Sequence, residues 1–423
     1  MENLIHIPKM RLRSYRFDPF PYWIVLLIFG LIFGAAGAYQ VLRYGLQVTG
    51  LSDAVPWGLW IVIDISSIAL GGSAFVFGVI VYLLNFKRFE VVGRLAVLLG
   101  FLGYSTAGLV LLFDLGQPLR FWHPVVFWQP HSLLWEITMC VVLYLNVLIA
   151  ELVPIILEHP FFDKNALTER YNWAQKLSDW LKLLAHFLHK IGPALAVLGL
   201  TLSLLHQASL GATYGVLSGR GLWFSPSAPV LFVLSAMGGG TALLFILSVF
   251  VFRVMRPGLV SDDVLYDVAI VAGGVLLLCT YIRLWEWAVT NYYSFDQMVS
   301  IQKNLLNLVS PYNLTFWIGQ VLFGTVSGGM LLAAKRIKKF RYLIVAALLP
   351  VACVIVLRWN YNFAGLIASI TYDPFTPTVK LHSYIPTWQE IAVGTGVISY
   401  WLLGFSLAAR FLPFRSLVAH HDD

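Results

Sequence analysis

Ten apolar runs divide the chain, and each is long enough to cross a membrane. A spanning helix needs about 20 apolar residues, since each residue adds about 1.5 Å toward a hydrocarbon core of about 30 Å. The 423 residues are 59% hydrophobic and only 12% charged, with a mean hydropathy of +0.78, which excludes a soluble globular domain. We therefore predict an all-α integral membrane protein with ten transmembrane helices, at residues 22–42, 57–84, 95–115, 132–157, 191–213, 229–252, 264–288, 311–334, 342–362 and 386–411.

The positive charges predict how these spans are oriented. With the amino terminus in the cytoplasm, 21 of the 28 Lys and Arg residues fall on the inner side and 7 on the outer side. This bias follows the positive-inside rule and places both termini in the cytoplasm. The net charge of +7 is thus explained by topology, and we expect no nucleic-acid partner.

Recurring motifs suggest an internal duplication. Gly71-Gly72 lies midway along the second span and Gly238-Gly239-Gly240 midway along the sixth, and similar Arg-aromatic segments end the third and seventh. We predict two four-helix bundles of the same orientation, spans 2–5 and 6–9, flanked by spans 1 and 10. The corresponding segments are residues 1–56, 57–213, 214–362 and 363–423.

The longest inner connection, at about residues 158–190, has its own pattern. Apolar residues recur there at helical spacing opposite lysines. This pattern predicts an amphipathic helix that lies on the cytoplasmic face and contacts membrane lipid.

Ionisable side chains gather near the outer ends of spans 2–5. The stretch from Asp114 to His123 places a carboxylate, a guanidinium and an imidazole within ten residues. Helix rise puts Asp64 about 10 Å and Glu136 about 6 Å inward of the outer ends of their spans, and His206 lies at similar depth. Because a charge in hydrocarbon costs at least about 2.5 kcal/mol, these groups predict a shared polar site.

Simpler interpretations of the same residues remain open. Asp114 and Arg120 can form a structural ion pair at the interface, and His206 can donate to a neighbouring backbone carbonyl group. Either arrangement would satisfy the polar groups without a ligand.

Span four carries protonatable groups along one face. They recur at three- and four-residue spacing from the outer end almost to the inner end, and Tyr104 in span three can join them. Such a stripe predicts a proton path with water in its gaps, or else a polar face that packs on a neighbouring helix. The members are Ser132, Glu136, Cys140, Tyr144, Glu151 and Glu158.

A second set of polar residues lies in spans 7–9. Arg283 and Glu286 have the spacing of a helical ion pair. We interpret this set first as structural and second as another site. Its other members are Asn313, Gln320, Arg358, Trp359 and Asn360.

Three motifs together resemble one protein family. They are Val55-Pro56-Trp57-Gly58-Leu59-Trp60 with Gly71-Gly72, the Asp114–His123 stretch, and Ser132-Leu133-Leu134-Trp135-Glu136. The chain resembles the NrfD/PsrC family, the membrane subunits of polysulphide reductase-type respiratory complexes. Its ten spans are similar to the longer branch, which includes HybB-type hydrogenase subunits, QrcD-type menaquinone reductase subunits and the membrane subunits of alternative complex III.

The resemblance implies a haem-free subunit of the bacterial inner membrane that binds menaquinone or another quinone near its outer surface. It also implies a periplasmic iron–sulfur subunit as partner, with a molybdopterin-type, hydrogenase or multihaem cytochrome c subunit. The sequence agrees on haem, because histidines paired at two depths are missing: His123, His131, His206 and His382 all lie near the outer side. We expect no metal or iron–sulfur site, since Cys140, Cys279 and Cys353 lack paired spacing.

By this resemblance, the quinone head group would lie among Asp64, Asp114, Arg120, His123 and Glu136. His123 would donate the proton, because imidazole has a pKa near about 6.5, and Asp114 or Arg120 would hold it in place. Glu136 would connect the head group to the proton path. Trp57, Trp122 and His206 complete the expected quinone site.

Two other classes of protein fit part of the pattern. Intramembrane carboxylates and duplicated bundles are typical of ion-coupled secondary transporters. Against a transporter, the ionisable groups crowd one surface instead of the midplane, and no clear pair of broken helices is seen. A structural anchor without a ligand is the other alternative.

Overall fold

The computed structural model of the chain describes residues 18–159, 172–218, 220, 223–293, 314–366, 368–373 and 376–414. Within these ranges, ten helical segments are long and apolar enough to span a membrane, which confirms the predicted all-α membrane fold. They are Phe20–Val48, Leu59–Leu83, Lys87–Asp114, Leu133–Leu157, Gly192–Gly215, Ala228–Met255, Asp262–Val289, Thr315–Leu332, Phe340–Ala364 and Trp388–Phe411.

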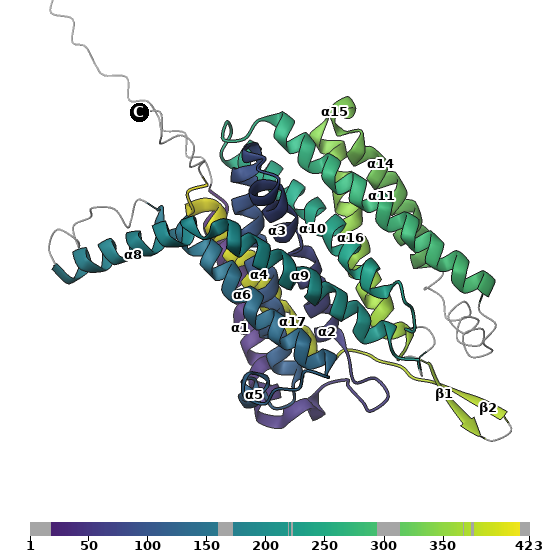
Figure 1. Cartoon of the computed structure of the whole chain (residues 1–423). Coiled ribbons are helices and arrows are strands. Elements are labelled where there is room, and N and C mark those ends of the chain that lie inside the picture. Colours follow the sequence, from purple (N-terminus) through teal and green to yellow (C-terminus); the bar gives the residue numbers. More distant parts are fainter. Residues whose placement is uncertain are drawn as a thin grey trace, which may run out of the picture.

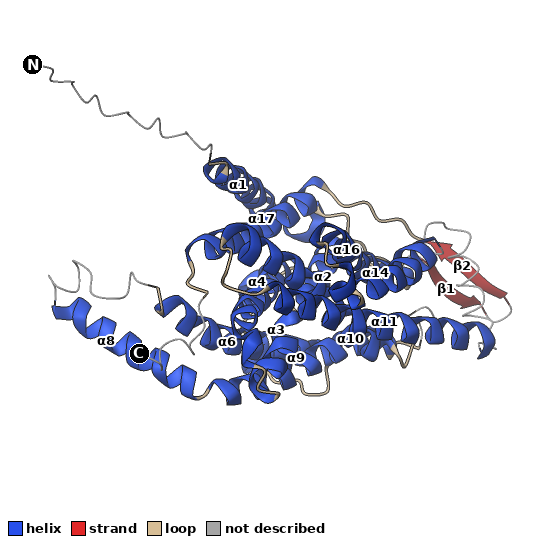
Figure 2. Ribbon diagram, turned by 90° about the horizontal axis from the view of Figure 1, so that it is seen from above, coloured by secondary structure: helices blue, strands red, loops and turns tan. Residues whose placement is uncertain are grey.

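The first and last of these helices pack against each other. Helices α1 (Phe20–Tyr44) and α17 (Trp388–Phe411) lie side by side (Figures 1 and 2). Their backbones approach so closely that a Cβ atom on Gly34 would lie 2.4 Å from the Gly396 Cα atom. Small residues permit such close helix packing in membranes. Helix α17 also packs on α2 and α4, described next.

The next four spans contact one another in a ring. The second span consists of α2 (Leu59–Leu70), α3 (Ser73–Gly78) and a π-helical segment, η2 (Val79–Leu83). Helix α4 (Glu90–Asp114) packs on α2 and on α6 (Leu133–Leu157). Helix α9 (Gly192–Gly215) closes the ring by packing on α6 and α3. We call these helices the first group.

Four further spans form a second ring of contacts. Helix α10 (Ala228–Ser248) continues into a π-helical segment, η6 (Val249–Met255), and α11 (Asp262–Tyr293) packs on α10. The next span joins η7 (Thr315–Leu322) to α14 (Phe323–Leu332), and the short α15 (Ala334–Ile337) follows it. Helix α16 (Phe340–Ala364) packs on α14 and α10. We call these helices the second group.

Glycine residues bring the two groups into contact. The second span is interrupted at Gly71-Gly72, where α2 ends and α3 begins. A Cβ atom on Gly72 would lie 2.7 Å from the Ala236 carbonyl oxygen of α10, and one on Gly240 would lie 2.8 Å from the Ser73 nitrogen. Only glycine fits at this crossing, so the two glycine motifs of the sequence belong to one interface.

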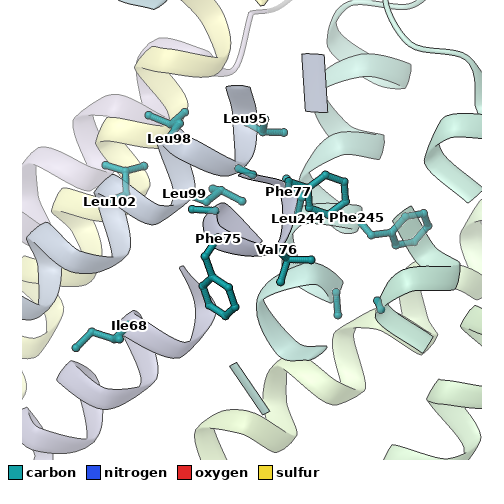
Figure 3. Close-up of a cluster of buried hydrophobic side chains, with 14 of the residues drawn as sticks. Ile68, Phe75, Val76, Phe77, Leu95, Leu98, Leu99, Leu102, Leu244 and Phe245 are labelled. Carbon is teal, nitrogen blue, oxygen red and sulfur yellow. The ribbon is translucent and has the colours of Figure 1, made fainter. Parts of the chain in front are cut away.

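Large apolar side chains surround this interface (Figure 3). Phe75 and Phe77 of α3 are buried together with Leu99 of α4 and with Leu244 and Phe245 of α10. Within a membrane these contacts contribute by close packing, because lipid is as apolar as the side chains. The core therefore supports both groups of helices at once.

Loops and short elements mark the two ends of the molecule. The short α5 (His123–Val126) and a hairpin lie at one end, and α8 and α15 lie at the other (Figure 1). We call these the outer end and the inner end, after the predicted periplasmic and cytoplasmic sides. Helix α8 (Asn172–Lys190) packs on α6 and extends away from the other helices, as Figure 1 shows, so the prediction of a helix in this connection is confirmed.

The antiparallel hairpin of β1 (Ala368–Asp373) and β2 (Thr376–Leu381) was not predicted. Its sequence alternates apolar residues with polar ones, but the segment is too short to stand out beside ten apolar runs. It projects from the outer end beyond the helices (Figure 1).

One predicted helix boundary is wrong in a way that matters for the site. Helix α4 begins at Glu90, five residues before the predicted start at residue 95. Arg94, which lies outside the predicted span 95–115, is therefore inside the helix and only 6% exposed.

Candidate functional site

Two carboxyl groups lie near each other at the outer end of the first group. Asp64, in α2, is 4% exposed, and Asp114 is the last residue of α4. The two side chains are close enough to interact electrostatically. The Oδ1 atom of each is buried without a hydrogen-bond partner among the described residues. Because buried polar atoms are nearly always partnered, the pair marks a place for water or a polar ligand.

A buried imidazole and two tyrosine rings lie deeper in the same group. The ring of Tyr104 is 4.6 Å from that of Tyr144 and 5.3 Å from that of His206, so α4, α6 and α9 meet here. The Tyr104 hydroxyl is 3.4 Å from the Ser203 Oγ atom. His206 is completely buried, and neither ring nitrogen has a partner in the described part of the chain. The alternative in which His206 donates to a backbone carbonyl is therefore wrong.

Gln207 connects this cluster to α2. Its Nε2 atom donates to the Ile68 carbonyl oxygen at 3.3 Å, while its buried Oε1 atom has no partner among the described residues. Tyr104 is also close enough to Asp64 to interact electrostatically. Four helices thus contribute polar groups, and these groups have more hydrogen-bond donors and acceptors than they use in bonds to each other.

Glu136 lies in the first turn of α6. Its Oε1 atom accepts a hydrogen bond from the Ser209 hydroxyl of α9 at 2.8 Å. Ser132 caps this helix, because its hydroxyl accepts from the Trp135 backbone nitrogen.

The outer loop after α4 carries the remaining predicted site residues. Arg120 is exposed and forms no ion pair with Asp114, so the structural pair considered for them is absent from the described residues. The His123 ring lies 4.4 Å from the ring of Trp122 and 5.2 Å from that of Phe127. Contrary to expectation, no hydrogen bond to Asp114 or Arg120 holds His123 in the described residues.

Trp57 belongs to an aromatic cluster where the two groups meet. Its ring stacks on Trp223 with centroids 5.5 Å apart and meets the edge of Tyr214 at 5.6 Å. The Asn362 amide donates to the Trp57 carbonyl oxygen at 2.9 Å and accepts from the Tyr214 hydroxyl at 3.2 Å. Tyr214 is also within electrostatic reach of Asp64. Tyr214, Trp223 and Asn362 were not predicted as site residues, because contacts between distant spans leave no local pattern in the sequence.

An ion-pair cluster occupies the inner end of the predicted proton path. The guanidinium group of buried Arg94 donates to both carboxylate oxygens of Glu158, at 2.5 and 3.1 Å, and lies 3.7 Å from Glu90. His189 of α8 lies 3.2 Å from Glu158. Burial disfavours the charged form of Glu158, but the hydrogen bonds from His189 and Arg94 outweigh it and lower the pKa of this carboxyl group.

A small cavity lies between this cluster and the inner part of α6, and residues of both line it. It has a volume of about 50 Å³ and is lined by Glu151, Tyr82 and Arg94, among other residues. Because one water molecule needs about 10–15 Å³, the cavity has room for a few. Glu151 lies seven residues from Tyr144, a gap of about 10 Å along the helix. Water in the cavity can join Glu151 to the ion-pair cluster, because Glu90, Arg94 and His189 also line the cavity, whereas Tyr144 does not.

The second group confirms one predicted pair. Arg283 and Glu286 form an ion pair within α11. The Asn360 amide donates to the Thr315 hydroxyl at 2.7 Å, which joins α16 to η7. Trp359 is 37% exposed, and Asn313 lies outside the described residues.

The described residues contain no group of three or more His, Cys, Asp or Glu side chains that could hold a metal ion. Fold and site together define a class, a multi-pass integral membrane protein with a buried polar cluster toward its outer end. Residues 47–369 match the family described as polysulphide reductase, NrfD, and the chain belongs to this family.

Relatives with known names are similar over nearly their whole length. The menaquinone reductase integral membrane subunit of Nitratidesulfovibrio vulgaris is 32% identical, over 93% of this chain and 91% of that protein. The probable Ni/Fe-hydrogenase 2 b-type cytochrome subunit of Escherichia coli is 26% identical, over 94% and 91%. The Hdr-like menaquinol oxidoreductase integral membrane subunit of Archaeoglobus fulgidus is 21% identical, over 95% and 96%.

Proposed function

We propose that this chain is the quinone-binding membrane subunit of a respiratory oxidoreductase complex in the bacterial inner membrane. The unpartnered carboxyl pair of Asp64 and Asp114 carries the proposal. The names of two relatives, a menaquinone reductase subunit and a menaquinol oxidoreductase subunit, favour menaquinone as the substrate.

The head group of the quinone would lie between the outer loop and the carboxyl pair. Reduction of a quinone takes two electrons and two protons, so its oxygens need groups that can donate protons. Asp64 and Asp114 are near one another and free to donate to or accept from a ligand oxygen. His123, partly buried between aromatic rings, has ring nitrogens that can donate to or accept from a head-group oxygen. Arg120 and Trp122 would lie at the rim.

The electrons would come from or go to a partner outside the membrane. We propose a periplasmic iron–sulfur subunit, joined to a molybdopterin-type, hydrogenase or multihaem cytochrome c subunit. The outer loop supports such docking, because its apolar side chains are exposed: Leu119 is 86% exposed and Trp128 is 66% exposed. We also propose that the chain itself holds no haem or iron–sulfur cluster.

A proton path along α6 would feed the quinone site from the cytoplasm. Its members would be Glu158, Glu151, Tyr144, Tyr104 and Glu136. The contacts of Tyr104 with Tyr144 and Ser203 support its middle part, and the inner cavity beside Glu151 supports its beginning. The gaps between these groups require water.

The quinone site is tested by the binding of a fluorescent quinone analogue to the complex purified from membranes. We expect Asp64→Leu and Asp114→Leu each to weaken binding by about fivefold or more, because leucine can neither donate to nor accept from the head group. His123→Ala should slow quinone turnover more than it weakens binding. Asn146→Leu, which removes an exposed amide elsewhere on α6, is the matched control. Native affinity in both aspartate variants would exclude this site.

The proton path is tested by potential formation in vesicles that contain the complex. Glu136→Gln and Glu151→Gln should abolish the potential while quinone-analogue binding remains. Asp263→Asn changes an exposed carboxylate at the inner end and should have no effect. If both glutamate variants form the full membrane potential, the polar face of α6 serves helix packing and conducts no protons.

A further inference from the structure

The second group buries an arginine without an ionic partner. Arg358, in α16, is completely buried. Its Nη2 atom donates to the Phe232 carbonyl oxygen at 3.1 Å and to the Ser235 hydroxyl at 3.0 Å, and the guanidinium group lies 3.6 Å from the centre of the Phe232 ring. Its Nε and Nη1 atoms have no hydrogen-bond partner in the described part of the chain. A buried charge in this state is costly unless an opposite charge lies nearby.

A cavity lies one hydrogen bond away from Arg358. It has a volume of about 50 Å³ and is formed by α10, α11, α16 and the span of η7 and α14. Ser235, which accepts a hydrogen bond from Arg358, is one of the residues that line it. The other polar residues that line it are Cys279, Thr280, Arg283, Gln320 and Cys353.

Gln320 provides the cavity with a free donor in a fixed orientation. Its Oε1 atom accepts from the Arg283 Nε atom at 2.8 Å, which determines where the amide nitrogen points. The Nε2 atom is buried and has no partner among the described residues. An amide nitrogen can only donate, so the missing partner is an acceptor.

Around this cavity, two arginines and one glutamate leave one positive charge without a partner among the described residues. Arg283 is neutralised by Glu286. Glu286 is itself occupied, because its Oε1 atom accepts from Ser225 at 2.6 Å, from Ser227 at 2.8 Å and from Tyr361 at 3.2 Å. The charge of Arg358 is therefore not balanced by any of these groups.

We propose that this cavity binds a small monovalent anion such as chloride. The Nε2 atom of Gln320 would donate to the ion, and the charge of Arg358 would attract it through Ser235. A cavity of about 50 Å³ has room for one such ion with a water molecule. A neutral carbonyl group would satisfy the donor but would leave Arg358 without a counter-charge. Nothing in this inference depends on the quinone site.

The experiment measures the thermal unfolding of the full chain, purified with the subunits that accompany it. Unfolding is compared in chloride and in gluconate at one ionic strength, since gluconate is too large for the cavity. We expect the unfolding midpoint to rise with chloride and to saturate. Gln320→Leu should weaken the apparent chloride affinity by about tenfold or more, because a hydrogen bond to an ion is lost.

Two further variants complete the design. Asn146→Leu removes a lipid-facing amide and should keep the native chloride response. Arg358→Gln should abolish the rise of the unfolding midpoint with chloride. If this variant does not fold, the chloride response of Gln320→Leu tests the proposal alone. Equal midpoints in chloride and gluconate would overturn the proposal, as would the same chloride response in native protein and Gln320→Leu. Quinone-analogue binding that needs Gln320 and ignores chloride would overturn it as well.

Discussion

Replacement of Glu158 by glutamine separates two roles that the structure gives to this residue. Glu158 belongs to the proposed proton path, yet it also neutralises the buried Arg94 side chain. Removing one member of a buried ion pair costs about 3–5 kcal/mol. Glu158 is 27% exposed and Glu90 stays 3.7 Å from Arg94, so we expect a smaller loss, about 2 kcal/mol.

The assay is thermal unfolding of the purified chain in one detergent, with Glu151→Gln as the matched variant. Glu151 lines the inner cavity and has no ion pair among the described residues, so its replacement should cost less than that of Glu158, about 1 kcal/mol or below. In the double variant Arg94→Met with Glu158→Gln, the unpaired charge is gone, and about 1 kcal/mol should return.

Two results would refute this reasoning. One is a Glu158→Gln variant as stable as the native protein, which would mean that solvent or Glu90 already neutralises Arg94. The other is a double variant whose loss equals the sum of the two single losses. A coupling of zero would show that the pair contributes no stability.

The remaining predictions concern packing, capping, acid stability and haem. Gly240→Ala should destabilise the protein by about 1–3 kcal/mol because its Cβ atom would meet the Ser73 nitrogen, whereas Gly274→Ala, with open space around it, should be neutral or stabilising. Thr387→Ala removes the capping box of α17 and should cost about 1 kcal/mol in the same unfolding assay, and Thr395→Ala should cost less. Because the pKa of Glu158 is lowered from its ordinary value of 4.5, the carboxylate stabilises the fold above pH 4.5, and this stabilisation is lost as the pH falls below that value. The loss of stability on acidification should therefore be smaller in Glu158→Gln than in the native protein. A pyridine haemochrome spectrum of the purified chain should show no haem b, and one haem per chain would contradict the haem-free proposal.

Hydropathy was enough to find the ten spans, because a membrane imposes one length and one composition on every helix. Depth along a helix also follows from counting, and Asp64 and Asp114 do lie near each other. Proximity in sequence was a poorer guide. His123 lies nine residues after Asp114, but the chain turns at Gly116, whose φ of +68° is one that glycine tolerates best, and the imidazole makes its contacts elsewhere.

Contacts between distant spans could not be predicted from a single sequence. Asn362 reaches Trp57 across 305 positions, and Arg94 meets Glu158 across 64. Arg94 fell outside the predicted span because the sequence does not distinguish a charged residue in the last turn of a helix from one in the adjoining loop. Its i,i+4 spacing to Glu90 was the one local signal of a helix there.

The glycine crossing between α3 and α10 limits how this protein can move. Secondary transporters alternate access largely by rocking one bundle of helices against the other. Here Gly72 and Gly240 bring the backbones of the two groups into direct contact. A movement of one group against the other would have to break this contact. Such a contact favours a fixed frame, in which the proposed proton path would work through side-chain rotation and water.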